Sequence, residues 1–179
     1  MVPTLFLVIL LALGPGVLQA QEPRVTALTA TLNGTQVSVH FSLENAFDNE
    51  ELEKALRSGL PTGFTYHIEM VRRRPRWFDT LAAGSTIEVV CTFNSLTHEY
   101  LLNYRRDRRL VRSETFTDLE RLKERMTTIE EEDLLPIGSF RPSKLVVRAK
   151  ADVTRGFLFY VIPWEISTAW KEARVSRVR

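Results

Sequence analysis

Apolar side chains alternate with polar ones along most of the chain after residue 20. A period of two is typical of β-strands that bury one face against a core and leave the other in water. A continuous apolar run also occurs, and it predicts a strand that is buried on both faces. The alternating segments are residues 24–32, 37–43, 64–70, 87–93, 100–104, 110–116, 145–153 and 164–170, and the continuous run is residues 157–162. The pattern therefore predicts a protein built mainly from strands.

Short polar segments mark turns between these strands. Asn33-Gly34 separates the first two, and both residue types tolerate the positive φ angles of a two-residue type I′ turn. Asp107-Arg108 marks a second turn, before the strand at residues 110–116. The acidic run Glu130-Glu131-Glu132-Asp133 is interpreted as a solvated turn, with pairing to a basic cluster inside the fold as the alternative.

Two short helices are expected to interrupt the strands, and each begins with a capping box. The first box is Asp48-Asn49-Glu50-Glu51, followed by Leu52, Ala55 and Leu56 on one face and by stop signals at Ser58-Gly59 and Pro61. The second box is Thr117-Asp118-Leu119-Glu120, followed by Leu122, Met126 and Ile129 at helical spacing. Each helix has a single apolar stripe, so we expect it to pack against a sheet face or to close an end of the fold.

The predicted fold is mainly β: an antiparallel β-sandwich with immunoglobulin-like layering and two short accessory helices. A hydrophobic fraction of 44% argues against global disorder. Neither an internal repeat nor a low-complexity linker divides the chain, so residues 21–179 are expected to form a single domain with one core.

The first twenty residues predict a cleavable secretory signal peptide. The apolar run from Leu5 to Leu13 is shorter than the roughly 20 residues that span a bilayer, and Gly14-Pro15-Gly16 breaks it before Ala20. Cleavage near Ala20 would place residues 21–179 in the periplasm or outside the cell. The residues before the apolar run lack the usual Lys or Arg, and an N-terminal membrane anchor that is not cleaved remains the alternative.

Charge and cysteine content exclude several kinds of protein. The formal net charge of +2 is too close to neutral to indicate nucleic-acid binding. Cys91 is the only cysteine, so no intramolecular disulfide can form. Small secreted eukaryotic domains usually carry disulfides, so this count favours a bacterial periplasm. Because Cys91 shares an apolar strand face with Val89 and Phe93, we expect a buried, unreactive thiol.

No motif for catalysis or cofactor binding is present. The chain lacks a Gly-x-Ser-x-Gly elbow and a glycine-rich phosphate loop. His40, His67 and His98 are too far apart in the sequence for a zinc helix or knuckle, and we interpret them as surface or hydrogen-bonded residues. We therefore expect no catalytic residue, no metal and no cofactor.

Two basic clusters are the most suggestive surface features. The first contains Arg72, Arg73, Arg74, Arg76 and Trp77, and the second contains Arg105, Arg106, Arg108 and Arg109. Arginine beside aromatic side chains suits phosphate-bearing groups, including lipid headgroups, because guanidinium forms bidentate bonds and stacks on rings. Both clusters also lie where strands should end, and charges there protect strand edges from unwanted pairing. Convergence of the two clusters on one face would favour a binding role over this protective role.

Several segments together resemble a bacterial family, the domain of unknown function 4390. They are Ser58-Gly59-Leu60-Pro61 before an arginine-rich strand, the strand at residues 145–153, the apolar run from Phe157 to Ile162, and the segment Pro163-Trp164-Glu165-Ile166-Ser167-Thr168-Ala169-Trp170. The resemblance covers most of residues 21–179 and implies a secreted or periplasmic protein of Gram-negative bacteria without an established activity. It implies structural roles for Gly59, Pro61, Trp164 and Trp170, and no catalytic set. Genes of this family are often found near an envelope-sensing histidine kinase, which suggests an association with signalling.

The sequence therefore predicts a non-enzymatic binding or accessory protein of the bacterial envelope. Its expected partner is another envelope protein, such as the sensory domain of a histidine kinase. The alternative is an anion- or lipid-headgroup-binding module that uses the two arginine clusters and contacts a membrane surface. A third hypothesis is an enzyme whose site is assembled by the fold without a recognisable motif.

Overall fold

The computed structural model describes the backbone of residues 21–48, 50–158 and 162–177, and the side chains of these residues except 154–165. The predicted signal peptide, residues 1–20, lies outside the described residues. The elements are β1 (Arg24–Asn33), β2 (Gln36–Glu44), α1 (Glu50–Arg57), β3 (Thr62–Arg72), β4 (Thr80–Asn94), β5 (Glu99–Arg106), β6 (Arg109–Phe116), α2 (Leu119–Thr127), β7 (Thr128–Pro136), the 3₁₀ turn η1 (Pro142–Lys144), β8 (Leu145–Leu158), β9 (Ile162–Ser167) and β10 (Lys171–Arg177).

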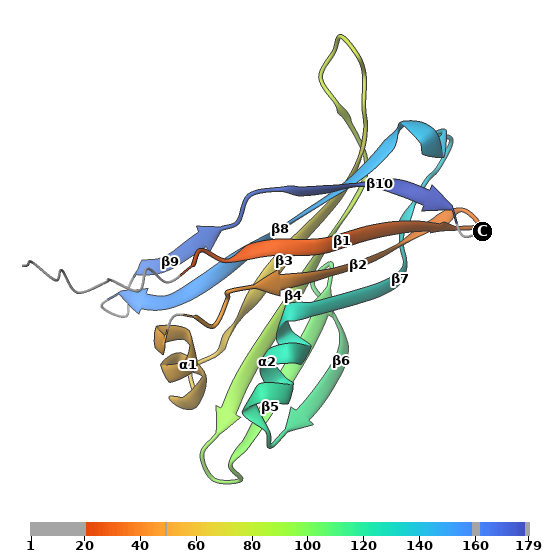
Figure 1. The fold of residues 1–179 in the computed structure, drawn as a ribbon. Helices are drawn as coiled ribbons and strands as arrows, with labels where there is room; N and C mark the ends of the chain where they lie inside the picture. The colour runs from red at the N-terminus through yellow and green to blue at the C-terminus, as the bar shows by residue number, and fades with distance from the viewer. Residues whose placement is uncertain (1–20, 49, 159–161, 178–179) are drawn as a thin grey trace, which may run out of the picture.

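The described strands form one curled, mixed sheet, which resembles half of a barrel (Figure 1). Its order is β6-β5-β4-β3-β8-β10-β1-β2-β7, and β9 pairs with β8 beside this path. The mainly β class with two α-helices is confirmed. The expected immunoglobulin-like sandwich is not confirmed, because β10 lies between β8 and β1 and joins the strands into a single sheet. The prediction of purely antiparallel pairing is wrong at one place, since β10 runs parallel to β1.

The alternating segments form strands where the sequence predicted them, up to residue 158. The predicted strand at residues 157–162 is divided between β8 and β9, and residues 159–161 lie outside the described residues. The predicted strand at residues 164–170 ends earlier, at Ser167, and a further strand, β10, follows it. The first turn is displaced by one residue, because Asn33 pairs with Gln36 and the loop consists of Gly34 and Thr35. Gly34 has a φ of +60°, which glycine adopts without a steric penalty.

The concave face of the curled sheet holds the core. Side chains from strands that are far apart in the sheet meet there, as shown by the rings of Phe41 in β2 and Tyr66 in β3, whose centroids are 5.4 Å apart. Both helices add leucine or methionine to this interior: Leu52 and Leu56 from α1, Leu122 and Met126 from α2. The Tyr66 hydroxyl donates a hydrogen bond of 2.8 Å to the Met126 carbonyl, which satisfies a polar group deep in the core. The helices therefore pack against the sheet, as predicted.

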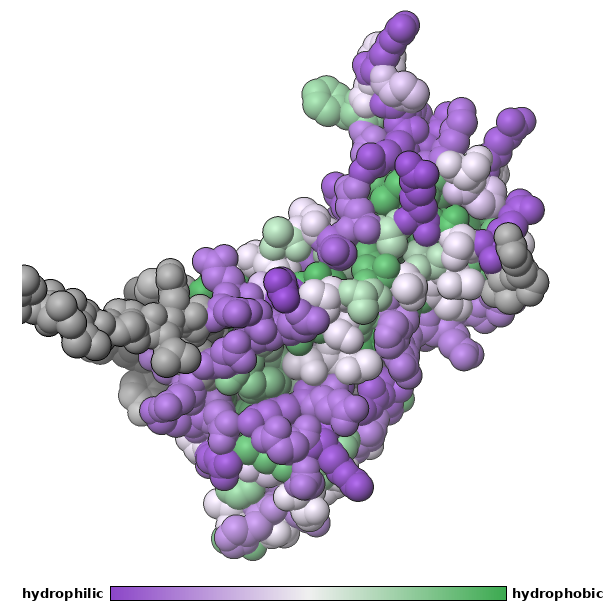
Figure 2. Space-filling model, in the orientation of Figure 1, coloured by the Kyte–Doolittle hydropathy of each residue, from purple (hydrophilic) through white to green (hydrophobic). Residues whose placement is uncertain are grey.

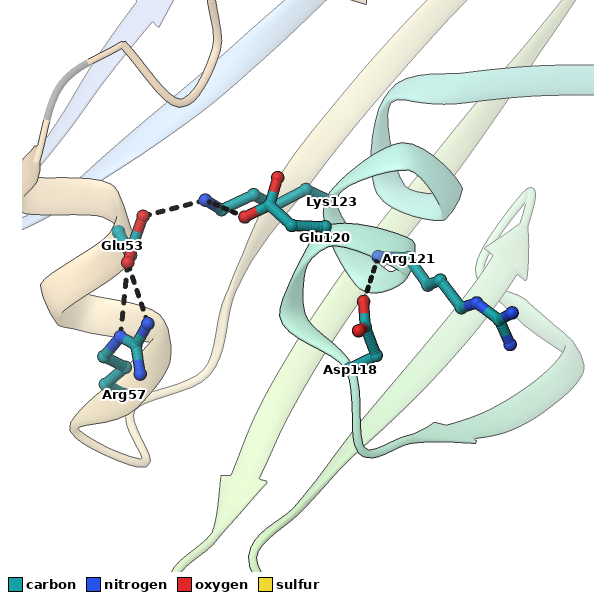
Figure 3. A network of polar contacts seen from close by, with 6 residues as sticks. All are labelled: Glu53, Arg57, Asp118, Glu120, Arg121 and Lys123. Carbon is teal, nitrogen blue, oxygen red and sulfur yellow. Dashed lines mark hydrogen bonds and ion pairs between the residues drawn. The ribbon is translucent and has the colours of Figure 1, made fainter.

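The two helices are joined by a lysine that lies between two carboxylates (Figure 3). Lys123 of α2 donates to Glu53 of α1 at 2.8 Å and to Glu120 of its own helix at 2.9 Å. Hydrogen bonds from Lys123 and from Arg57 lower the pKa of Glu53. The Lys123–Glu53 contact therefore links α1 to α2.

The start and end of α2 differ from the prediction. Asp118, not Thr117, is the N-cap, and its carboxylate accepts a hydrogen bond of 2.8 Å from the Arg121 backbone N–H. The helix ends at Thr127, so Ile129, predicted on the helical stripe, is buried from β7. The first capping box is only partly described, because residue 49 lies outside the described residues.

The acidic run predicted as a solvated turn is part of strand β7, and its second glutamate points into the fold. Glu131 is 9% exposed. Its carboxylate accepts a hydrogen bond of 2.7 Å from the Tyr104 hydroxyl and one of 3.1 Å from Arg106, both in β5. Because β7 and β6 are the two ends of the sheet, this cluster connects the two sides of the half-barrel opening through side chains. The alternative for this run, pairing with a basic cluster inside the fold, is confirmed for Glu131 and Arg106.

Candidate functional site: a basic surface around the β3–β4 hairpin

The hairpin formed by β3 and β4 projects beyond the rest of the sheet (Figure 1). Neighbouring strand β8 begins at Leu145, opposite Arg72, and β5 ends at Arg106, opposite Ile87 of β4. The first seven residues of β4 therefore have no β5 partner. At the tip, Trp77 is 79% exposed and Phe78 is 95% exposed. Neighbouring large apolar side chains that are exposed together can mark an interaction surface.

The arginines of this hairpin differ in how far they are engaged by the fold. The Arg72 guanidinium lies 5.9 Å from the centroid of the Phe140 ring, and Arg73 pairs with Glu172 of β10. The Arg74 backbone N–H donates to Asp79, which shapes the turn. Among the described residues, the side chains of Arg74 and Arg76 form no ion pair. Two exposed guanidinium groups are thus available beside the exposed aromatic rings.

Further cations surround the base of the hairpin, and sequence reasoning missed them. Lys144 in η1 and Arg174 in β10 lie beside Arg73 around one hollow, and Arg141 and Arg177 lie around the next. Their only sequence signal is two pairs of basic residues with the same spacing of three positions. The topology brings these pairs to the hairpin, because β10 lies against β8 and β8 lies against β3.

Charge is unevenly distributed over the molecule as a result. The region around the hairpin and its base carries eight cations and two carboxylates. The rest of the chain contains the other 16 of the 24 Lys and Arg residues and the other 20 of the 22 Asp and Glu residues, so carboxylates outnumber cations there. The eight cations are Arg72, Arg73, Arg74, Arg76, Arg141, Lys144, Arg174 and Arg177, and the carboxylates are Asp79 and Glu172. Figure 2 shows hydrophilic side chains extending from the hairpin and from the corner beside it. We call this region the basic corner.

The second predicted cluster does not join the basic corner, so the convergence of both clusters that would favour a shared binding role is not observed. It lies at the β5–β6 turn, and Arg106 is opposite Ile87, seven residues along β4 from Thr80. At about 3.3 Å per residue, the two clusters are separated by roughly 23 Å along the strand. Its members also have internal partners: Arg105 pairs with Glu88 at 3.8 Å, and Arg106 pairs with Glu131. Arg108 and Arg109 are exposed at the turn.

The predicted buried thiol is confirmed. Cys91 is free and fully buried on the concave face, and burial raises the pKa of its thiol to about 12. A thiol with this pKa is almost entirely protonated near neutral pH and is a poor nucleophile.

The three histidines lie in separate surroundings. His40 is 3.4 Å from Glu130, His67 bonds to Asp152, and the ring of His98 packs on Phe93. Within the described part of the chain, no three His, Cys, Asp or Glu side chains are grouped closely enough to hold a metal ion.

One constellation on the convex face contains the residue types of a catalytic triad. His67 and Asp152 are 2.7 Å apart, and the Ser167 hydroxyl donates a hydrogen bond of 2.6 Å to the same carboxylate. Burial of Asp152 acts to raise its pKa, but hydrogen bonds from Ser167, His67 and Lys150 outweigh it and lower the pKa. In a triad the histidine lies between the serine and the carboxylate. Here the carboxylate is in the middle, so His67 is not placed to activate Ser167.

Residues that the family resemblance marked as structural have clear surroundings where they are described. Gly59 follows α1 with a φ of +80°, a conformation that ends helices. The Trp170 ring lies 4.7 Å from the Arg148 guanidinium and 5.6 Å from the Lys150 ammonium group. Cation–π contacts of this kind attach the segment before β10 to the convex face of β8.

Comparison with known families gives one match. The model of the family described as Domain of unknown function (DUF4390) matches residues 20–173. No curated protein and no solved structure matched the chain. The matched region contains the whole β3–β4 hairpin together with Arg141 and Lys144, and it ends one residue before Arg174. None of the helices in the described part of the chain is long and apolar enough to cross a membrane.

Proposed function

Because this chain belongs to the DUF4390 family, whose description names no activity, we propose a function from its own surface: a non-enzymatic binding protein of the bacterial envelope that attaches to anionic membranes through the β3–β4 hairpin. In this proposal residues 1–20 are a signal peptide that is removed near Ala20. The remaining chain acts in the periplasm and uses no metal or cofactor.

The observation that carries this proposal is the combination of exposed rings and exposed arginines on one projecting hairpin. Trp77 and Phe78 offer apolar surface to the boundary between headgroups and acyl chains, where aromatic side chains are favoured. Arg74 and Arg76 precede these rings, form no ion pair with the side chains that the structure describes, and can bond to lipid phosphates. A cation near an anionic leaflet contributes about 1 kcal/mol, so two to four arginines contribute roughly 2–4 kcal/mol. We therefore expect reversible, salt-sensitive attachment.

The rest of the molecule favours a defined orientation. The chain outside the basic corner has more carboxylates than cations, so an anionic membrane repels it while attracting the corner. The hairpin extends past its neighbours, which lets its tip reach the headgroup region before other parts of the sheet make contact. The attached protein would then hold the sheet away from the lipid surface.

Co-sedimentation with vesicles tests this function. The full chain without residues 1–20 is mixed with vesicles that contain phosphatidylglycerol, or with vesicles of phosphatidylcholine alone. We expect binding to the first only, and loss of binding in the variant Arg74→Glu with Arg76→Glu. The variant Trp77→Ser with Phe78→Ser should weaken binding while keeping the charge.

The second arginine cluster supplies the matched control. Arg108→Glu with Arg109→Glu makes the same change in net charge at another exposed turn of the same sheet. Its distance of roughly 23 Å from the hairpin exceeds the Debye length of about 8 Å at physiological salt, so we expect little effect. Equal loss in both double variants would show that only net charge matters and would refute a hairpin site.

The vesicle experiment also bears on the hypothesis of a protein partner. The family resemblance suggests such a partner, for example the sensory domain of a histidine kinase. Two results together would replace the membrane proposal with that hypothesis. The unaltered protein would fail to bind vesicles, and it would bind one envelope protein that the hairpin variants do not bind.

A further inference from the structure

A hollow of about 490 Å³ lies at the base of the hairpin, where β10 passes from one neighbouring strand to the other. β10 pairs with β8 as far as Arg174, opposite Val146, and it pairs with β1 from Val175 onwards. The hollow lies between β10 and the start of β8, and its wall includes the cations Arg73, Lys144 and Arg174. The change of partner strand therefore brings cations from three segments of the chain around one space.

The register of the strands places this wall on the convex face of the sheet. Val146 of β8 and Val71 of β3 lie opposite each other, and both are buried although neither belongs to the core on the concave face. Arg174 lies opposite Val146 and shares its face, because directly paired residues of neighbouring strands point the same way. Glu172 is two residues from Arg174 in the same strand, so it also lies on this face, and it pairs with Arg73. Arg73 and Arg174 thus project from the same side of the sheet as Val146.

The ion pair of this wall leaves two of its cations without a partner. Among the side chains that the structure describes, Lys144 and Arg174 form no ion pair, whereas Arg73 pairs with Glu172. Three cations against one carboxylate give the wall a net charge of +2. A phosphate monoester carries about −1.5 to −2 near neutral pH and matches this charge. A phosphodiester or a carboxylate carries a single negative charge and leaves about half of it uncompensated.

The groups in the wall also suit phosphate. A guanidinium group presents five N–H donors in a planar fork that bonds two phosphate oxygens at once, and the Lys144 ammonium group adds three more. The ion pair with Glu172 holds the guanidinium group of Arg73 at the wall. Val146, which is buried, forms an apolar part of the same wall. Such a surface excludes water locally and strengthens the interaction between charges.

From this arrangement we propose that the hollow binds one phosphate monoester, with Lys144 and Arg174 bonding its oxygens and Arg73 adding a third positive charge. The ligand is either a soluble phosphate monoester or a lipid whose headgroup ends in one, because both present the same group. The site lies at the base of the hairpin and not at its tip. It therefore does not depend on the proposed membrane attachment.

Titration of the chain without residues 1–20 with methyl phosphate, followed by amide NMR spectra, tests the site. We expect saturable shifts of the signals around Val146 and Arg174, and weaker binding of dimethyl phosphate, the corresponding diester. Arg174→Gln should reduce the affinity for methyl phosphate about tenfold, because it removes a hydrogen-bonded charge. Arg177→Gln is the matched control, since it makes the same change in net charge in the same strand. Position 177 is three residues further on and points to the opposite face, so we expect an effect within about twofold.

The variant Glu172→Gln should change the affinity in the opposite direction. Its amide oxygen can still accept a hydrogen bond from Arg73, but the negative charge in the wall is removed. We therefore expect methyl phosphate to bind roughly fivefold tighter. A variant that had lost its fold would not bind more tightly, so this result would also show that the hollow is intact.

Several results would overturn the site. They are the absence of saturable shifts, equal affinity for methyl phosphate and dimethyl phosphate, equal losses in Arg174→Gln and Arg177→Gln, and a Glu172→Gln variant that binds no more tightly than the unaltered protein. The variant Trp77→Ser with Phe78→Ser separates this inference from the membrane proposal. It keeps every cation, so it should bind methyl phosphate as the unaltered protein does while binding vesicles weakly.

Vesicles distinguish the two sources of the monoester. Phosphatidylcholine vesicles that contain phosphatidic acid, a monoester, are compared with vesicles of equal surface charge that contain phosphatidylglycerol, a diester. A preference for phosphatidic acid that Arg174→Gln removes indicates a lipid ligand. Binding of methyl phosphate without that preference indicates a soluble monoester.

Discussion

Removing the Glu131 carboxylate tests whether the opening of the half-barrel is held together by side chains. In Glu131→Ala, the Tyr104 hydroxyl loses its acceptor inside the core and Arg106 loses its ion-pair partner. Removing one partner of a buried ion pair costs about 3–5 kcal/mol. The Arg106 side chain is 37% exposed, so water solvates part of its charge, and we expect a reduction of about 2–3 kcal/mol in the free energy of unfolding.

Urea unfolding followed by tryptophan fluorescence measures this change, and the melting temperature should fall by roughly 5–10 °C for a domain of this size. Glu132→Ala is the control, because it removes the neighbouring carboxylate of β7 from an exposed position and should change stability by less than about 0.5 kcal/mol.

A double-mutant cycle attributes the loss to the pair. Glu131→Ala, Arg106→Gln and their combination should give a coupling energy of about 1 kcal/mol or more, because the residues are in direct contact. A coupling energy near zero, or a loss for Glu131→Ala no larger than that of Glu132→Ala, would refute the idea that this cluster stabilises the opening. Tyr104→Phe should cost less than Glu131→Ala, since it removes one hydrogen bond and leaves the ion pair intact.

Three further changes test other parts of the fold. Gly63→Ala should destabilise the protein by about 1–3 kcal/mol in urea unfolding, because the added Cβ would lie 2.0 Å from the Val89 carbonyl oxygen, and Gly84→Ala, which has room, is its control. Cys91 should resist thiol reagents in the native protein at neutral pH and react fully in urea, and rapid native labelling would contradict its burial. Asp152→Asn should lower the free energy of unfolding at neutral pH. Because the pKa of Asp152 in the folded protein lies below its ordinary 3.8, the difference in stability between variant and unaltered protein should persist down to about that pH. It should disappear as the pH falls further. A difference between the two proteins that grows in acid would show that the sign is wrong.

The strands were predictable because a half-buried strand leaves its mark in its own residues. In β2, Val37, Val39, Phe41 and Leu43 are all buried, as the alternation indicates. Strand β10 was missed because only Ala173 and Val175 provide its apolar face, and both are half-buried. Alternation of apolar and polar residues shows which side chains face a core, but it does not show which strands are neighbours. A sandwich and a half-barrel therefore produce the same alternation.

The same reasoning explains what was found and missed at the candidate site. The hairpin arginines are adjacent in the sequence, and their basic character is visible as a run from Arg72 to Arg76. Arg174 joins them only because β10 pairs with β8, which no local pattern reveals. Glu131 was interpreted as solvated because four acidic residues follow one another, and only the curl of the sheet brings Arg106 and Tyr104 to it.

The position of β10 has a consequence for the order of events during biosynthesis. It is the last described strand to be synthesised, yet it lies between β8 and β1 and pairs with both. Until it emerges, the nascent chain holds two incomplete halves with unsatisfied edges, and contacts between distant parts of a chain form slowly. The two halves of the sheet are therefore joined only once β10 has been synthesised.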